Sequence, residues 1–118
     1  MNLAELFHHE TDLQTLAAGQ ALFKEGESGE LMYVLMSGTA EIIVSNRVME
    51  TAEAGTILGE MAMIDEGTRS ATVIAKTDCK LLPIDRKRFN FMIQQTPNFA
   101  LNMMRVVANR LRRTDVCL

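Results

Sequence analysis

Hydrophobic residues between Thr11 and Asp85 come in short or alternating runs that are separated by turn residues. Runs of this length and spacing are typical of β-strands. The eight runs are Leu13–Leu16, Ala21–Lys24, Leu31–Ser37, Ala40–Ser45, Val48–Ala52, Thr56–Leu58, Ser70–Lys76 and Cys79–Ile84. Eight short antiparallel strands in so small a domain predict two sheets rolled together, an eight-stranded β-roll of the jelly-roll type. Pro83 cannot donate to a ladder, so it is expected at a sheet edge or a bulge.

Helices are predicted on both sides of this mainly β region. Asn2 is a suitable cap for a short N-terminal helix that runs through Phe7. After Asp85 the hydrophobic spacing changes to that of a helix, and Pro97 interrupts it. The pattern therefore predicts two C-terminal helices, Arg86–Gln95 and Asn98–Thr114.

The second C-terminal helix has a broad predicted apolar face. Its members recur at helical spacing, and they are Ala100, Met103, Met104, Val107, Ala108 and Leu111. Such a face must cover another apolar surface. The mouth of the β-roll and the same helix of a second chain are both candidates for that surface.

The chain of 118 residues is expected to form one domain. Residues 1–10 would hold the N-terminal helix, 11–85 the β-roll, and 86–118 the hinge and lid helices. A net charge of −3 gives no basic excess for nucleic acid or for an anionic membrane. No apolar run reaches the ~20 residues of a membrane span, and no signal peptide is seen. The two cysteines form no motif, so a reducing, cytoplasmic location is expected.

The stretch Leu58–Ile74 carries the candidate chemistry. Gly59 permits close approach of the backbone, Glu60 follows it, and Arg69 ends a polar tip before the next strand. A guanidinium is suited to a phosphate, and free amides at the start of the short turn Met61–Ile64 would favour the same anion. Because Glu60 would repel phosphate, it should face a hydroxyl-bearing part of the ligand. A phosphate and a sugar hydroxyl together suggest a nucleotide.

This stretch resembles the phosphate-binding cassette of the cyclic nucleotide-binding domain family, of the catabolite activator and protein kinase regulatory subunit type. The family pattern is G-E-[apolar]-A-[apolar]-[apolar], a few loop residues, then P-R-[AS]-A-[ST], and residues 58–72 fit it except at Thr68, where proline is usual. The segment Glu25–Gly38 resembles a second family motif. The resemblance implies the same β-roll over nearly the whole chain.

Site residues follow from the resemblance. Arg69 would bind the cyclic phosphate, with the amides of Ser70 and Ala71 and the Ser70 hydroxyl as further donors. Glu60 would accept from the ribose 2′-hydroxyl. The cassette's remaining contacts would come from Gly59 and the amides of Met61 and Ala62. The alternatives are an Arg69 ion pair with Glu60 or Asp65, a solvated Glu60, and ordinary turn residues elsewhere.

Contacts to the base are implied by a second similarity. The run Ala108–Asp115 resembles a family segment whose arginine and threonine reach toward adenine, which carries those roles to Arg110 and Thr114. A solvated arginine at the helix end is the alternative. Ile42 and Met49 would line the base pocket or belong only to the core. Cyclic AMP is favoured over cyclic GMP through Thr114, while the Ser70 hydroxyl leaves cyclic GMP open.

The leading hypothesis is a non-enzymatic regulatory module that binds a cyclic purine nucleotide and moves its C-terminal helices. No catalytic pair, metal cluster or phosphate loop of the nucleotide-triphosphate type is seen, so neither a cofactor nor a metal is expected. Partners would be a second copy or an effector protein, and without a helix-turn-helix no nucleic acid is expected. The alternatives are an interaction domain of the same fold that needs no nucleotide, and a cupin-like enzyme.

Overall fold

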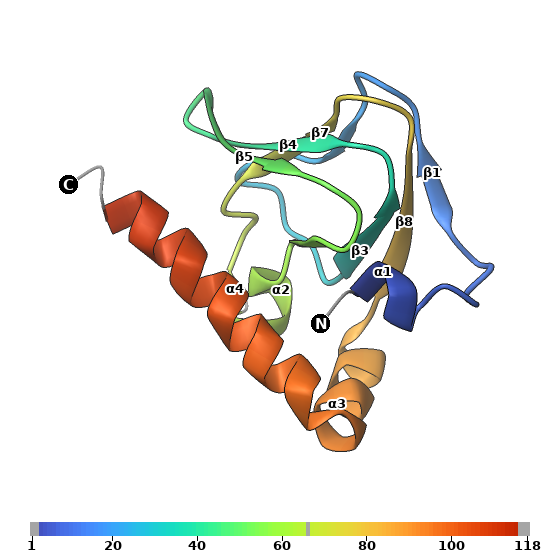
Figure 1. The fold of residues 1–118 in the computed structure, drawn as a ribbon. Coiled ribbons are helices and arrows are strands. Elements are labelled where there is room, and N and C mark those ends of the chain that lie inside the picture. The colour runs from blue at the N-terminus through green and yellow to red at the C-terminus, as the bar shows by residue number, and fades with distance from the viewer. Residues whose placement is uncertain (1–2, 66, 116–118) are drawn as a thin grey trace.

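The computed structural model describes residues 3–65 and 67–115, and for 113–115 the backbone only. Its eight strands are β1 (Gln14–Leu16), β2 (Ala21–Phe23), β3 (Met32–Ser37), β4 (Ala40–Val44), β5 (Arg47–Ala52), β6 (Ile57–Leu58), β7 (Thr72–Ala75) and β8 (Cys79–Ile84). They form two antiparallel sheets, β1-β8-β3-β6 and β2-β7-β4-β5, which face each other as a roll (Figure 1). The predicted eight-stranded β-roll is confirmed.

In the described part of the chain, four helices flank the roll: α1 (Leu3–Leu6), α2 (Met61–Ile64), α3 (Arg86–Gln95) and α4 (Pro97–Asp115). Asp85 caps α3, because its side chain accepts a hydrogen bond from the Arg88 amide at 2.8 Å. Pro97 is the first residue of α4 rather than the break before it, since a first-turn residue needs no backbone donor. The predicted cap of α1, Asn2, lies outside the described residues.

Pro83 shows how a strand can be interior and still have a local edge. β8 lies between β1 and β3, so the expectation of an edge strand is wrong for β8 as a whole. However, β1 pairs with β8 only from Cys79 to Leu81, whereas Pro83 lies opposite Tyr33 of β3. The missing N–H of Pro83 therefore lies beyond the first residue of β1, Gln14, which pairs with Leu81.

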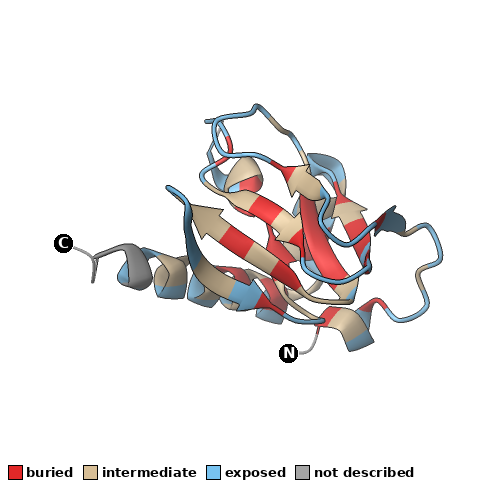
Figure 2. Cartoon of the chain, turned by 90° about the horizontal axis from the view of Figure 1, so that it is seen from above, coloured by how far each residue is buried: buried red, intermediate tan, exposed pale blue. Residues whose placement is uncertain are grey.

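Two hydrophobic clusters hold the molecule together. The first fills the roll and includes Phe23, Leu35, Ile42 and Leu81. The second joins β3 and β8 to the helices, with Leu3, Ile84, Phe99 and Met103 among its members. Buried positions consequently appear as red bands across the strands in Figure 2.

α4 extends along one side of the roll and passes α2 (Figure 1). Its buried face includes Phe99 and Met103, which are 0% and 4% exposed. The Phe99 ring packs edge-to-face against the Phe89 ring of α3, with 5.9 Å between the ring centroids. Met104 and Leu111 are 64% and 57% exposed. The predicted single apolar face is thus wrong in part, because the helix turns Met104 away from the roll. No helix in the described ranges is long and apolar enough to cross a membrane.

Candidate functional site

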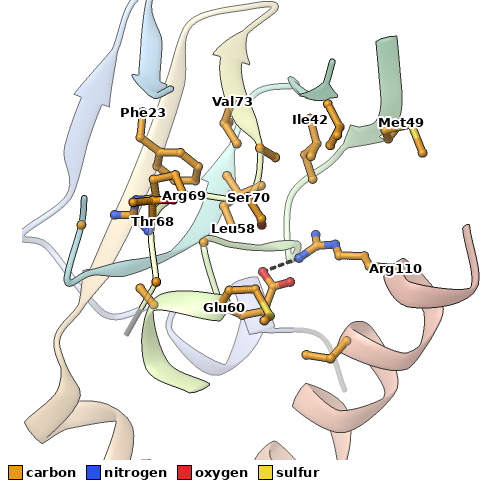
Figure 3. Close-up of a pocket in the computed structure, with 18 of the residues that line it drawn as sticks. Phe23, Ile42, Met49, Leu58, Glu60, Thr68, Arg69, Ser70, Val73 and Arg110 are labelled. Carbon is orange, nitrogen blue, oxygen red and sulfur yellow. Dashed lines mark hydrogen bonds and ion pairs between the residues drawn. The ribbon is translucent and has the colours of Figure 1, made fainter. Parts of the chain in front are cut away.

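A cavity of about 300 Å³ lies between the open end of the roll, the cassette and α4 (Figure 3). Every predicted site residue except Thr114 lines it, and these residues are Ile42, Met49, Gly59, Glu60, Met61, Ala62, Arg69, Ser70, Ala71 and Arg110. Thr114 lies on α4, but its side chain is outside the described part of the structure. Residues far apart in the sequence therefore meet at one concave site.

Arg69 is a buried cation with unused donors. Its side chain is 9% exposed and lies against the Phe23 ring, with Cζ 4.1 Å from the ring centroid. Among the described residues, neither Nε nor Nη1 has a hydrogen-bond partner. Burial lowers the pKa of Arg69, with Tyr33 and Glu27 acting in the opposite direction. Buried guanidinium donors without partners are unfavourable, and an anion would satisfy them.

Two glycines make room for this guanidinium. A Cβ on Gly29 would lie 2.4 Å from the Arg69 Nε and Nη2 atoms, and one on Gly59 would lie 2.7 Å from Nη1. Gly59 also has a φ of +73°, a conformation that side chains other than glycine rarely adopt. The backbone of Arg69 is held as well, because its amide donates to the Glu27 carbonyl oxygen at 2.7 Å. The guanidinium is therefore confined between these two glycines and the Phe23 ring.

The backbone amides of the cassette divide into two groups. Those of Ser70 and Ala71 precede β7 and donate to no other described residue. The Ala62 amide donates to the Gly59 carbonyl oxygen at 3.2 Å. This donor is thus already used within the turn, and the ligand role of the Ala62 amide stays a prediction. The two unpaired amides directly follow Arg69 in the chain, so the donors for an anion lie together at one end of the cavity.

Glu60 is buried at the cavity wall and faces α4. It is 6% exposed, and its Oε2 atom accepts from Arg110 Nη1 at 2.6 Å (Figure 3). Both alternatives from the sequence fail here: Glu60 is not solvated, and its ion pair is with Arg110 rather than with Arg69. A carboxylate offers roughly four acceptor positions, so Glu60 can accept from a ligand hydroxyl while it remains paired.

Arg110 joins α4 to the roll through several contacts. Its Nε and Nη2 atoms donate to the two carboxylate oxygens of Glu50, each at 3.2 Å, and Nη2 also donates to the Ile57 carbonyl oxygen at 2.7 Å. Burial alone would lower the pKa of Arg110, but Glu60 and Glu50 outweigh it and the pKa is raised. The alternative of a solvated arginine at the helix end is therefore wrong. The Arg110 guanidinium instead connects α4 to residues on the other side of the cavity.

Glu50 is a charged site residue that the sequence analysis missed. It lies on β5 and lines the cavity next to Met49, and its side chain is 18% exposed. No motif includes it, and its partner Arg110 is 60 positions away in the chain. The one signal in the sequence is that Glu50 is a charged residue within a predicted strand that also carries apolar residues.

The far end of the cavity, away from Arg69, is apolar. Figure 3 places Ile42 and Met49 on this side, and Val44 of the roll and Val107 and Leu111 of α4 also line the cavity. The arrangement thus offers donors for an anion, a carboxylate for a hydroxyl, and an apolar slot for a planar group. Among the described residues, no group of three or more histidine, cysteine or acidic side chains is placed to hold a metal ion.

Comparisons with known proteins agree with the fold and with the family resemblance. A profile of the "Cyclic nucleotide-binding domain" family matches residues 13–96. The cyclic AMP receptor protein of Thermus thermophilus is 31% identical over 103 residues, which cover 83% of this chain and 48% of that protein. The chain therefore spans about half the length of this relative.

Two further proteins are similar. A cGMP-dependent protein kinase of Caenorhabditis elegans, egl-4, is 35% identical over 78 residues, covering 66% of this chain and 10% of the kinase. A structure of cAMP-bound PfPKA-R (141–441) superimposes with a TM-score of 0.82 at 23% identity, covering 97% of this chain and 43% of that one. At this identity the superposition supports the fold. The fold, the cassette and the profile match together show that this chain belongs to the cyclic nucleotide-binding domain family.

Proposed function

We propose that this domain binds a cyclic purine nucleotide in the cavity and transmits its binding through movement of α3 and α4. The observation that carries the proposal is the buried guanidinium of Arg69, whose Nε and Nη1 atoms have no described partner. The amides of Ser70 and Ala71, which follow Arg69 in the chain, are also unpaired among the described residues. A cyclic phosphate would satisfy these donors, and a guanidinium suits its oxygens better than an ammonium does.

The other two parts of the ligand follow from the rest of the cavity. Glu60 would accept from the ribose 2′-hydroxyl, and the apolar slot lined by Ile42, Met49 and Val107 would hold the base. We favour cyclic AMP over cyclic GMP, as the similarity at Thr114 suggests. The cyclic AMP receptor protein and the cGMP-dependent kinase are both relatives, so the preference itself needs a competition experiment.

α4 is the element best placed to report on binding. Val107, Arg110 and Leu111 line the cavity, so a ligand inside contacts α4 directly. We propose that the hinge lies at Pro97–Asn98, where α3 meets α4. The exposed side chains Leu101, Met104 and Leu111 would suit a second copy of the chain or an effector protein.

Amide hydrogen exchange tests the movement of α4. Saturating cyclic AMP should slow exchange over Ala100–Thr114, because a ligand shifts the helix only toward the position in which it binds better. Deleting Val107–Leu118 should weaken binding mainly through faster release, while the cassette still captures the phosphate. If exchange over α4 stays the same at saturating cyclic AMP, α4 does not close over the ligand. If protection of α4 instead rises with protein concentration, α4 forms a dimer interface.

A further inference from the structure

The short cassette helix α2 is held at both ends by arginines from the C-terminal helices. At its start, Glu60 is paired with Arg110 of α4. At its end, Arg86 of α3 donates from Nη1 to the Met63 carbonyl oxygen at 3.1 Å and from Nη2 to the Ala62 carbonyl oxygen at 3.0 Å. We propose that Arg86 is the positioning residue that couples the cassette to α3, an inference that rests on the proposed function.

The position of Arg86 in its own helix supports this role. Arg86 is the first residue of α3, where the positive end of the helix dipole disfavours a cation. The last carbonyl groups of α2 have no partners within that helix, and their partial negative charge favours a cation. The electrostatic benefit of Arg86 therefore lies in its contact with α2 rather than in α3.

The contact also depends on the shape of the guanidinium. Two of its nitrogen atoms donate to two successive carbonyl groups, so the side chain is fixed by two bonds in one plane. A lysine ammonium could keep the charge but not this geometry. A displacement of α2 in the cassette would thus be passed to the first turn of α3.

From α3 the connection continues back to the ligand site. Phe89 of α3 packs against Phe99 of α4, and Arg110 of α4 returns to Glu60 at the start of α2. The cassette, α3 and α4 consequently form a closed ring of contacts. In this ring Arg86 of α3 donates two hydrogen bonds to α2, so its removal should separate binding from the response of the helices.

The experiment compares wild type with Arg86→Gln and Arg86→Lys, with Arg88→Gln as the matched control. Arg88 lies on the same helix but pairs with Glu10, away from the cassette. Arg86 is exposed, so its substitution should leave the fold intact. Affinity for cyclic AMP is measured by calorimetry, and amide exchange is measured over α2, α3 and α4 with and without the ligand.

We expect Arg86→Gln and Arg86→Lys to bind cyclic AMP within roughly five-fold of wild type, about 1 kcal/mol, while the ligand-induced change in exchange over α3 and α4 falls by more than half. Arg88→Gln should keep that change. An Arg86→Gln response equal to that of wild type would overturn the inference.

The ligand-free protein provides a separate arm. Arg86→Gln should speed exchange at the Met63–Asp65 amides before any nucleotide is added, and Arg88→Gln should not. If wild type binds no cyclic nucleotide, the proposed function fails on that result alone. The contact between α2 and α3 is then refuted or supported by the ligand-free arm.

Discussion

Arg69→Ala should remove most of the affinity for cyclic AMP and leave the domain folded. Loss of one partner from a buried, hydrogen-bonded charge pair costs roughly 2–5 kcal/mol. At about 1.4 kcal/mol per decade, the dissociation constant rises on the order of thirty-fold to several thousand-fold. Calorimetry on the folded variant measures this change directly.

The stability of the same variant is informative because the Nε and Nη1 donors of Arg69 have no described partner. Removing them relieves an unfavourable burial, while loss of the contact with the Phe23 ring acts in the opposite direction by roughly 0.5–2 kcal/mol. The melting temperature should therefore change little.

Two variants serve as controls for Arg69. Arg69→Lys keeps the charge but loses the planar fork, so it should also bind poorly. Arg105→Ala removes an exposed arginine of α4 that does not line the cavity, so it should bind as wild type does. Nearly unchanged affinity in folded Arg69→Ala would refute the phosphate role.

The second large effect concerns Glu60 and the ribose. Cyclic AMP that lacks the 2′-hydroxyl should bind wild type more weakly by roughly 1–3 kcal/mol, because a buried acceptor loses its donor. That range is about five-fold to 150-fold in affinity. With Glu60→Ala the two ligands should bind almost alike, and Arg110 should stay in place through Glu50 and the Ile57 carbonyl oxygen.

The matched measurement is a four-way comparison of two proteins and two ligands by calorimetry. The difference between the ligands, rather than the absolute affinity, reports on Glu60, so any general weakening of the variant cancels. Discrimination that survives Glu60→Ala would show that another group reads the hydroxyl.

The strands and the cassette could be predicted because their signals are local. Alternation and turn residues within a few positions define each strand, and the family motif fixes Gly59, Glu60 and Arg69 relative to one another. The ends of β7 were harder to predict. The run Ser70–Lys76 looks continuous, but β7 is Thr72–Ala75, because Ser70 and Ala71 turn their amides toward no strand partner.

What could not be predicted depends on contacts between distant parts of the chain. The clamp of Arg110 on Glu60 and Glu50 joins positions at least 50 residues apart, and no periodicity encodes such a pairing. The exposure of Met104 likewise depends on how α4 rotates against the roll. The helical spacing identifies apolar positions, but it does not say which of them the partner surface reaches.

The central claim is that this cavity binds a cyclic nucleotide, and a calorimetric titration of nucleotide-free protein tests it most directly. Cyclic AMP should give saturable heat with one site per chain, and cyclic GMP should compete more weakly. The account would be contradicted if neither ligand gave saturable heat at millimolar concentration. Such a result would mean a binding free energy weaker than about 4 kcal/mol. That result would favour an interaction domain of the same fold that needs no nucleotide.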